Sequence, residues 1–246
     1  LSLVGSEMCI RDSLTLAPAP VCGQLKHSMP IELPYDTDLL SFNRNRADCG
    51  TACPVALPAE RFPSEIRCGG VRFVTGPKED LAANAVICRG QKLSIPEGAK
   101  YLSLMMASLS GDRRTALTIG KTGFLFTVHD LLEAVGKWDL YGMQETGQIK
   151  QTVLAWNATH LHRGDADSYG EQAYFFKYTF EIPEGAKSFT LPLDQNLLLL
   201  AASGTDLPAC RTAAPLYDTL KKREFDFWIT EKDRRLAHPG MLSKAA

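Results

Sequence analysis

The clearest pattern along the chain is an alternation of apolar and polar positions over Gln172–Ile182. Every second side chain is aromatic or branched, and the residues between them include Lys177, Thr179 and Glu181. The apolar set is Tyr174, Phe176, Tyr178, Phe180 and Ile182. Since successive side chains of a β-strand point to opposite faces, this spacing predicts a half-buried strand with one face in a core.

Shorter runs of the same kind recur between about Ile31 and Ala202, separated by Gly, Pro and Asp residues typical of turns. They predict further strands at Val71–Thr75, Ala85–Arg89, Tyr101–Leu109, Thr115–Ile119, Gly123–Val128, Gln151–Trp156, Lys187–Leu191 and Asn196–Ala202. Tyr101–Leu109 is apolar on both faces, which is typical of a strand covered on each side. Many short strands with little helical periodicity predict an all-β fold, an antiparallel β-sandwich of jelly-roll type.

One six-residue sequence, Ile-Pro-Glu-Gly-Ala-Lys, occurs twice, at Ile95–Lys100 and at Ile182–Lys187. Each copy ends one predicted strand and begins the next. We expect proline at the second position of a type I turn, with glycine taking the left-handed position after it. The repeat therefore predicts one turn used at two comparable corners of a sandwich.

The sequence also predicts how the chain is divided into a core domain and flanking segments. Residues 1–13 resemble translated sequencing-adapter sequence, and we interpret 14–30 as a linker from an upstream domain, 31–207 as the sandwich and 208–246 as a partly helical tail. Asp130–Val135 predicts a single helical turn with Asp130 as its N-cap. The chain is expected to be a fragment of a longer polypeptide, which leaves its compartment open, a periplasmic or secreted location among the alternatives.

Charge and composition exclude two classes of partner. The chain has 27 basic and 28 acidic residues, a net charge of −1 and no long basic cluster, which argues against nucleic acid. The apolar run Leu197–Ala202 is far too short to cross a bilayer, so no membrane partner is expected. Among seven cysteines, Cys49 and Cys53 could form a local disulfide or half of a metal site, but no second pair completes a zinc motif.

An acidic and amide-rich segment near the start of the sandwich is the first candidate site. Carboxylate and amide oxygens are the ligands that Ca²⁺ prefers, and the segment offers Asp36, Asp38, Asn45 and Asp48. The alternative is that these side chains stabilise turns through hydrogen bonds to their own backbone.

The second candidate is Trp156, His160 and His162 in the sequence AWNATHLHRGD. If the strand continues, the three even-numbered side chains share one face, where an indole ring can stack on a sugar and imidazoles can bond its hydroxyls. His-x-His can also chelate a metal, although two ligands do not make a site. The alternative is a buried tryptophan with two surface histidines. Trp138 and Asp139 form a further aromatic–carboxylate pair, and no catalytic residues stand out.

Several segments together resemble the C-terminal region of bacterial α-mannosidases of glycoside hydrolase family 38. The resemblance covers about residues 14–204 in order, and its most specific parts are AWNATHLH (155–162) and YFFKYTFEIPEGAKSFTLP (174–192). Supporting segments are LTLAPAPV (14–21), IELPYDTDLLS (31–41), NRAD (45–48), PAE (58–60), GVRFVTGP (70–77) and GKWD (136–139).

The resemblance implies a parent enzyme that hydrolyses α-mannosides with an Asp nucleophile and a zinc ion, both upstream of this region, so neither maps onto a residue here. It implies a non-catalytic accessory sandwich whose partners are the upstream domains of the same polypeptide and mannose-containing glycans. At 49–53 the chain lacks the second Asp of the family loop, which weakens the calcium hypothesis. The alternatives are a stand-alone carbohydrate-binding module and a structural domain of another multidomain hydrolase.

Overall fold

The computed structural model describes residues 28–46, 56–139, 146–150 and 152–206 of the chain. It divides into two compact units. The smaller unit contains the antiparallel hairpin of β11 (Gly136–Asp139) and β12 (Thr146–Ile149), and every other described strand belongs to the larger unit. Within the described residues, none of the helices has the length and apolar character needed to span a membrane.

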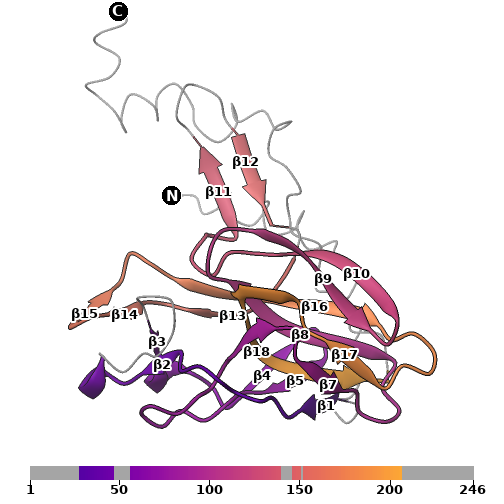
Figure 1. Cartoon of the computed structure of the whole chain (residues 1–246). Coiled ribbons are helices and arrows are strands. Elements are labelled where there is room, and N and C mark those ends of the chain that lie inside the picture. Colours follow the sequence, from indigo (N-terminus) through magenta and orange to yellow (C-terminus); the bar gives the residue numbers. More distant parts are fainter. Residues whose placement is uncertain (1–27, 47–55, 140–145, 151, 207–246) are drawn as a thin grey trace, which may run out of the picture. The chain divides into compact units, whose positions relative to one another are not determined.

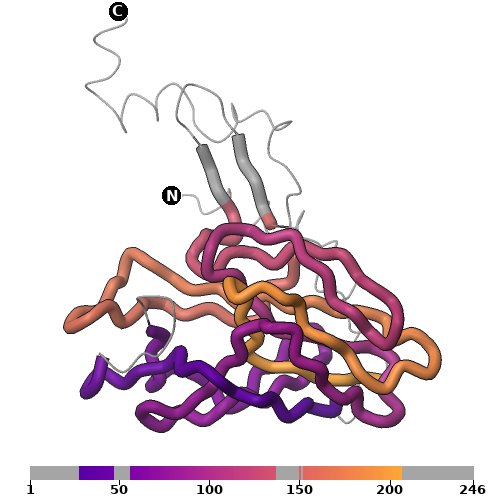
Figure 2. Tube along the Cα trace, in the orientation of Figure 1, coloured from indigo at the N-terminus to yellow at the C-terminus, as the bar shows by residue number. Residues whose placement is uncertain are grey.

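A six-stranded antiparallel sheet runs through the centre of the larger unit (Figure 1). Its strands, in spatial order, are β1 (Ser28–Ile31), β18 (Leu193–Thr205), β8 (Tyr101–Ser108), β16 (Ala173–Glu181) and β13 (Val153–Ala158), and β6 (Val86–Arg89) also pairs with β18. The first and last described strands of the unit are therefore neighbours, as the indigo and orange tubes of Figure 2 show.

One face of this sheet packs against a second, four-stranded sheet. The second sheet has the order β10 (Thr122–Val128), β9 (Arg113–Ile119), β17 (Ser188–Thr190), β7 (Lys92–Ser94). The core between the two sheets is apolar and fully buried, and it includes Leu102, Leu104, Met106, Leu117, Phe176 and Phe189. Packing of two antiparallel sheets across such a core is a β-sandwich, which confirms the predicted fold class.

The opposite face of the central sheet is also covered, by a layer of short strands. These are β2 (Leu40–Ser41), β3 (Leu57–Pro58), β4 (Glu65–Cys68), β5 (Val71–Val74), β14 (Leu161–Arg163) and β15 (Ala166–Ser168), with the 3-10 turns Asn43–Asn45 and Ala59–Arg61. Phe175 and Met105 of the central sheet meet Phe62 and Phe73 of this layer in a second buried core. The half-buried strand expected at Gln172–Ile182 is thus wrong in part, because Phe175 and Lys177 on its second face are buried as well.

The nine strands predicted from alternation are all present, with ends shifted by up to three residues. Two segments differ from expectation. Strand β1 begins at Ser28, inside the segment expected to be a linker. Asp130–Val135 forms bends rather than a helical turn, although the Asp130 carboxylate does accept the backbone N–H groups of Leu132 and Glu133 at 2.8 Å. Residues 1–13, the predicted tail and Cys49 and Cys53 lie outside the described residues.

The two copies of the repeated sequence form the same turn at two corners of the sandwich. Ala99 N–H donates to the Pro96 carbonyl at 3.2 Å, and Ala186 N–H donates to the Pro183 carbonyl at 3.0 Å. Proline therefore occupies the first position rather than the second, and the third position has a φ of 82° at Gly98 and 76° at Gly185. A positive φ at the third position is typical of a type II turn, which corrects the predicted type I turn.

Candidate functional site

The β14–β15 hairpin brings a histidine and an aspartate face to face. Its two-residue turn begins with Gly164, whose φ of 57° suits the first central position of a type II′ turn. The register pairs Arg163 with Ala166 and His162 with Asp167. Side chains that face each other on paired strands lie within contact distance, so the hairpin itself positions the imidazole against the carboxylate.

His162 is held by its backbone and by one of its two ring nitrogens. Its backbone exchanges hydrogen bonds with Ala56, at 2.9 and 3.0 Å, and its Nδ1 lies 2.9 Å from the Ser41 hydroxyl on β2. The side chain has no exposed surface. Its Nε2 is buried 3.7 Å from Oδ1 of Asp167, too far for a hydrogen bond, and it has no hydrogen-bond partner among the described residues.

Asp167, which faces His162, is hydrogen-bonded to two further side chains. Arg46 Nε donates to its Oδ1 at 2.8 Å, and the Tyr169 hydroxyl donates to its Oδ2 at 2.8 Å. The hydrogen bond from Arg46 and that from Tyr169 hold the pKa of Asp167 below its usual value. The carboxylate is therefore ionised at neutral pH and faces the buried nitrogen of His162.

His160 completes the cluster from the turn before β14. Its Nδ1 lies 3.2 Å from the Thr159 hydroxyl, and its ring lies 5.7 Å from that of His162 and 5.6 Å from that of Tyr169. One nitrogen of each histidine and one oxygen of Asp167 all lie within 4.8 Å of one another. Burial lowers the pKa of His162, against the opposing charges of Asp167 and Glu60, so its imidazole is neutral near pH 7. We call His160, His162 and Asp167 the hairpin cluster.

The structure separates Trp156 from the two histidines with which it was grouped. Strand β13 ends at Ala158, and β14 begins only at Leu161, so the continuous face expected for these three side chains does not form. Trp156 is partly buried and packs edge-on against Phe62, with ring centroids 5.0 Å apart. This packing agrees with the alternative that Trp156 belongs to the core rather than to a sugar-binding surface. Trp138 and Asp139 lie on β11 in the other compact unit.

Two of the oxygen ligands proposed for calcium, Asp36 and Asp38, accept hydrogen bonds from other parts of the fold. The Asp36 carboxylate accepts the Ile87 N–H at 2.9 Å and pairs with Arg89 at 2.6 Å. Asp38 Oδ1 accepts the Leu40 N–H at 3.1 Å and the Asn84 amide at 2.7 Å. Asn45 belongs to a 3-10 turn, and Asp48 lies outside the described residues. Only the bond from Leu40 is local, as the turn-stabilising alternative expects; the others join Asp36 and Asp38 to β6 and to Asn84.

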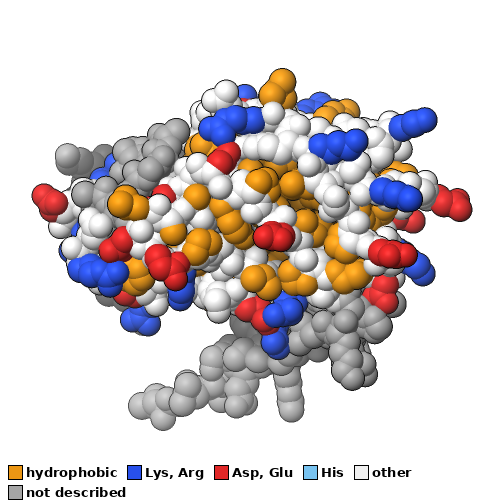
Figure 3. Space-filling model, turned by 60° about the horizontal axis from the view of Figure 1, so that its bottom comes forward, with side chains coloured by type: hydrophobic (Ala, Val, Ile, Leu, Met, Phe, Trp, Pro, Cys, Tyr) orange, Lys and Arg blue, Asp and Glu red, His pale blue; other side chains and the backbone are white. Residues whose placement is uncertain are grey.

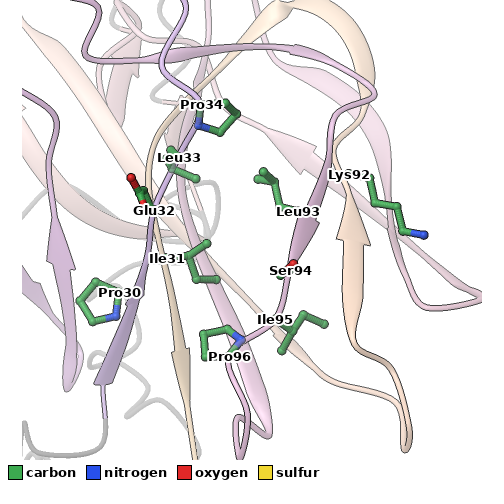
Figure 4. Close-up of a pocket in the computed structure, with 10 residues that line it drawn as sticks. All are labelled: Pro30, Ile31, Glu32, Leu33, Pro34, Lys92, Leu93, Ser94, Ile95 and Pro96. Carbon is green, nitrogen blue, oxygen red and sulfur yellow. The ribbon is translucent and has the colours of Figure 1, made fainter.

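A groove of about 650 Å³ lies between the free edges of the two sheets. One wall is β1 with the segment after it, and the other is β7 with the repeated turn (Figure 4). Ile31 and Leu93 point toward each other across it, and Lys92 points away. Figure 3 shows the underside of Figure 1, where apolar side chains form a band bordered by charged ones. The groove is lined by Pro30, Ile31, Glu32, Leu33, Pro34, Lys92, Leu93, Ser94, Ile95 and Pro96.

Comparison with known families agrees with this architecture. Residues 27–207 match the family described as AziU2-like beta-sandwich domain. The chain belongs to this family. The matched range begins one residue before β1 and ends one residue after Asp206, the last described residue. It therefore covers all the described strands of the larger unit, together with the hairpin of the smaller one. No curated protein matches the chain. The family match establishes the β-sandwich fold, and the family description names no activity.

Sequence reasoning selected His160 and His162 but missed four of their neighbours. Asp167 and Tyr169 had a local signal, because the Gly164-Asp165 turn folds the chain back so that His162 pairs with Asp167. Ser41 and Arg46 had none, since each reaches a partner 121 residues further along the chain.

Proposed function

We propose that this β-sandwich is a non-catalytic accessory module of a larger glycoside hydrolase similar to bacterial family-38 α-mannosidases. In this proposal the zinc ion and the nucleophile belong to the upstream catalytic part, and the module supports that part by packing against it. The groove between β1 and β7 carries the proposal, because it is the site where a neighbouring domain of the same polypeptide can bury apolar surface.

Two features of the groove suit this occupant. It is formed by the edge strands of both sheets, and edge strands are common sites of pairing with another segment. It also lies at Pro30–Pro34, directly after residues 1–27, so a domain joined through those residues is held next to it at a high effective concentration. A second hollow of about 320 Å³ on the Val74–Pro77 side of the same segment extends the apolar surface.

The test uses the full-length gene product beside the present chain, with hydrogen exchange measured at the amides of Lys92–Ile95. We expect slower exchange at these amides in the full-length protein, because a covered strand edge exchanges slowly. Ser94→Arg, which places an exposed charge in the groove, should abolish this difference. Thr122→Arg, exposed on the opposite edge of the same sheet, should leave it unchanged. Equal exchange in both proteins, or a gene without an upstream α-mannoside-hydrolysing domain, contradicts the proposal.

A second function, contact with mannose-containing glycans, is favoured by one observation on the β14–β15 hairpin. Tyr169 is 74% exposed and lies beside the ring of His160, with the Arg163–Glu171 ion pair on the same hairpin. An exposed aromatic ring flanked by polar groups is suited to stacking on a pyranose and bonding its hydroxyls. The surface for glycan is therefore Tyr169 and His160 rather than Trp156.

Affinity electrophoresis in gels containing mannan tests the second function. Wild-type protein should be retarded, and Tyr169→Ala should abolish the retardation without lowering the melting temperature. Leu125→Ala, which removes another exposed apolar side chain on β10, should be retarded like the wild type. Absence of retardation in the wild type refutes glycan contact and leaves the docking proposal unaffected.

A further inference from the structure

The hairpin cluster has the composition of a transition-metal site. Two imidazoles and one carboxylate are ligands that divalent ions such as Zn²⁺ and Fe²⁺ use, with one or more positions left to water. Their ligand atoms lie within 4.8 Å of one another although the side chains come from three places, the turn before β14, β14 and β15.

The spacing across the cluster fits a bridging cation better than a direct contact. In a tetrahedral zinc site with metal–ligand distances of about 2.1 Å, two ligand atoms are separated by about 3.4 Å. Nε2 of His162 and Oδ1 of Asp167 are 3.7 Å apart, longer than a hydrogen bond and close to this value.

The buried nitrogen of His162 is an independent indication. Nε2 has no hydrogen-bond partner among the described residues, and an unsatisfied polar atom in a fully buried side chain costs free energy. If Nδ1 donates its proton to Ser41, Nε2 carries a lone pair aimed at an ionised carboxylate. That arrangement is repulsive until a cation lies between the two groups.

The outer hydrogen bonds are those that metal-binding histidines require. Nδ1 of His162 contacts the Ser41 hydroxyl at 2.9 Å, and Nδ1 of His160 contacts the Thr159 hydroxyl at 3.2 Å. Partners of this kind fix the ring and the tautomer and leave Nε2 for the metal. Tyr169 fixes Asp167 through Oδ2, and Oδ1, which also accepts the Arg46 Nε–H, lies 3.7 Å from Nε2 of His162.

We propose that His160, His162 and Asp167 bind one divalent transition-metal ion through two imidazole nitrogens and one carboxylate oxygen, with water completing the coordination. The Arg46 guanidinium, 2.8 Å from the same Oδ1, repels the cation and moderates its affinity. This proposal does not depend on the proposed function.

Isothermal titration of the full chain with Zn²⁺ at pH 7.5 tests the site. Wild-type protein should bind zinc at a site that weakens at least tenfold in Asp167→Asn and in His160→Ala. Asp165→Asn removes an exposed carboxylate from the same hairpin and should bind like the wild type. Any zinc bound by cysteines is common to all four proteins and leaves these differences unchanged.

His160 is only partly buried, so His160→Ala keeps the test valid even if Asp167→Asn fails to fold. Circular dichroism of the metal-free variants checks that they are folded. Zinc binding that is absent in the wild type, or unchanged in both ligand variants, overturns the proposal.

Discussion

The two faces of the central sheet are covered in different ways. On one face lies a regular sheet whose β9 and β10 have seven residues each, and the core between them is apolar. On the other face lie strands of two to four residues, and the buried groups include Ser41, Asn84 and His162. Short strands form few of the regular hydrogen bonds of a β-ladder. Their buried polar groups must therefore form hydrogen bonds with side chains or with irregular backbone segments. The regular layer buries apolar surface, whereas the short-strand layer also brings buried polar side chains into contact.

The largest expected effect tests whether both layers bury the central sheet. Phe175 and Phe176 are neighbours on β16, each fully buried but on opposite faces. Replacing either by Ala should lower the free energy of unfolding by about 3–5 kcal/mol, because each change leaves a cavity. Urea denaturation measures both, with exposed Glu181→Ala as the control, expected within about 0.5 kcal/mol of wild type.

A cost below about 1 kcal/mol for Phe175→Ala alone contradicts the comparison, because the short-strand layer would then not bury that face.

A smaller effect should mark the polar contact of the short-strand layer. Ser41→Ala removes the hydroxyl that bonds the buried Nδ1 of His162 at 2.9 Å. Leaving that nitrogen unsatisfied should lower the free energy of unfolding by about 1–3 kcal/mol. Thr118→Ala, at an exposed position of the regular sheet, should change it by less than about 0.5 kcal/mol. Equal denaturation midpoints for the two variants would show that the Ser41–His162 contact contributes no stability.

The smallest expected effect uses one cysteine in each core. Burial raises the pKa of Cys88, in the core of the regular layer, to about 12, and it also raises the pKa of Cys68, which lies on β4 in the core of the short-strand layer. Only the thiolate reacts with iodoacetamide, so Cys88 should stay unmodified in the native protein at pH 8 and Cys68 should react slowly. Peptide mass spectrometry measures both, with the unfolded protein as the control. Faster modification of Cys88 than of Cys68 would contradict the expectation that the thiol in the regular-layer core is the less reactive of the two.

The regular part of the fold was predictable because its signal is local. Alternation over Gln172–Ile182 and the repeated turn sequence are each contained within a dozen residues, and both are present in the structure. Strands β2 and β3 have two residues each, too few to show alternation. The burial of Lys177 could not be predicted either, since it depends on a layer that the short strands build far away in sequence.

The candidate site was predictable only where the chain folds back on itself locally. The His-x-His spacing indicated the histidines, and the following Gly-Asp turn is compatible with pairing His162 and Asp167. Grouping Trp156 with them failed because the chain leaves its strand at Ala158. The contacts from Ser41 and Arg46 cross 121 residues, and such pairings follow from the packing of layers rather than from any local pattern.

X-ray absorption at the zinc edge tests most directly whether the short-strand layer holds a functional site. Zinc-loaded protein should show only nitrogen and oxygen neighbours at about 2.0–2.2 Å, as His160, His162, Asp167 and water provide. The histidine contribution should be reduced in His160→Ala, which leaves only His162, and kept in Asp165→Asn. Sulfur neighbours at about 2.3 Å, or a spectrum unchanged by His160→Ala, would place the metal on cysteines or elsewhere and contradict the assignment.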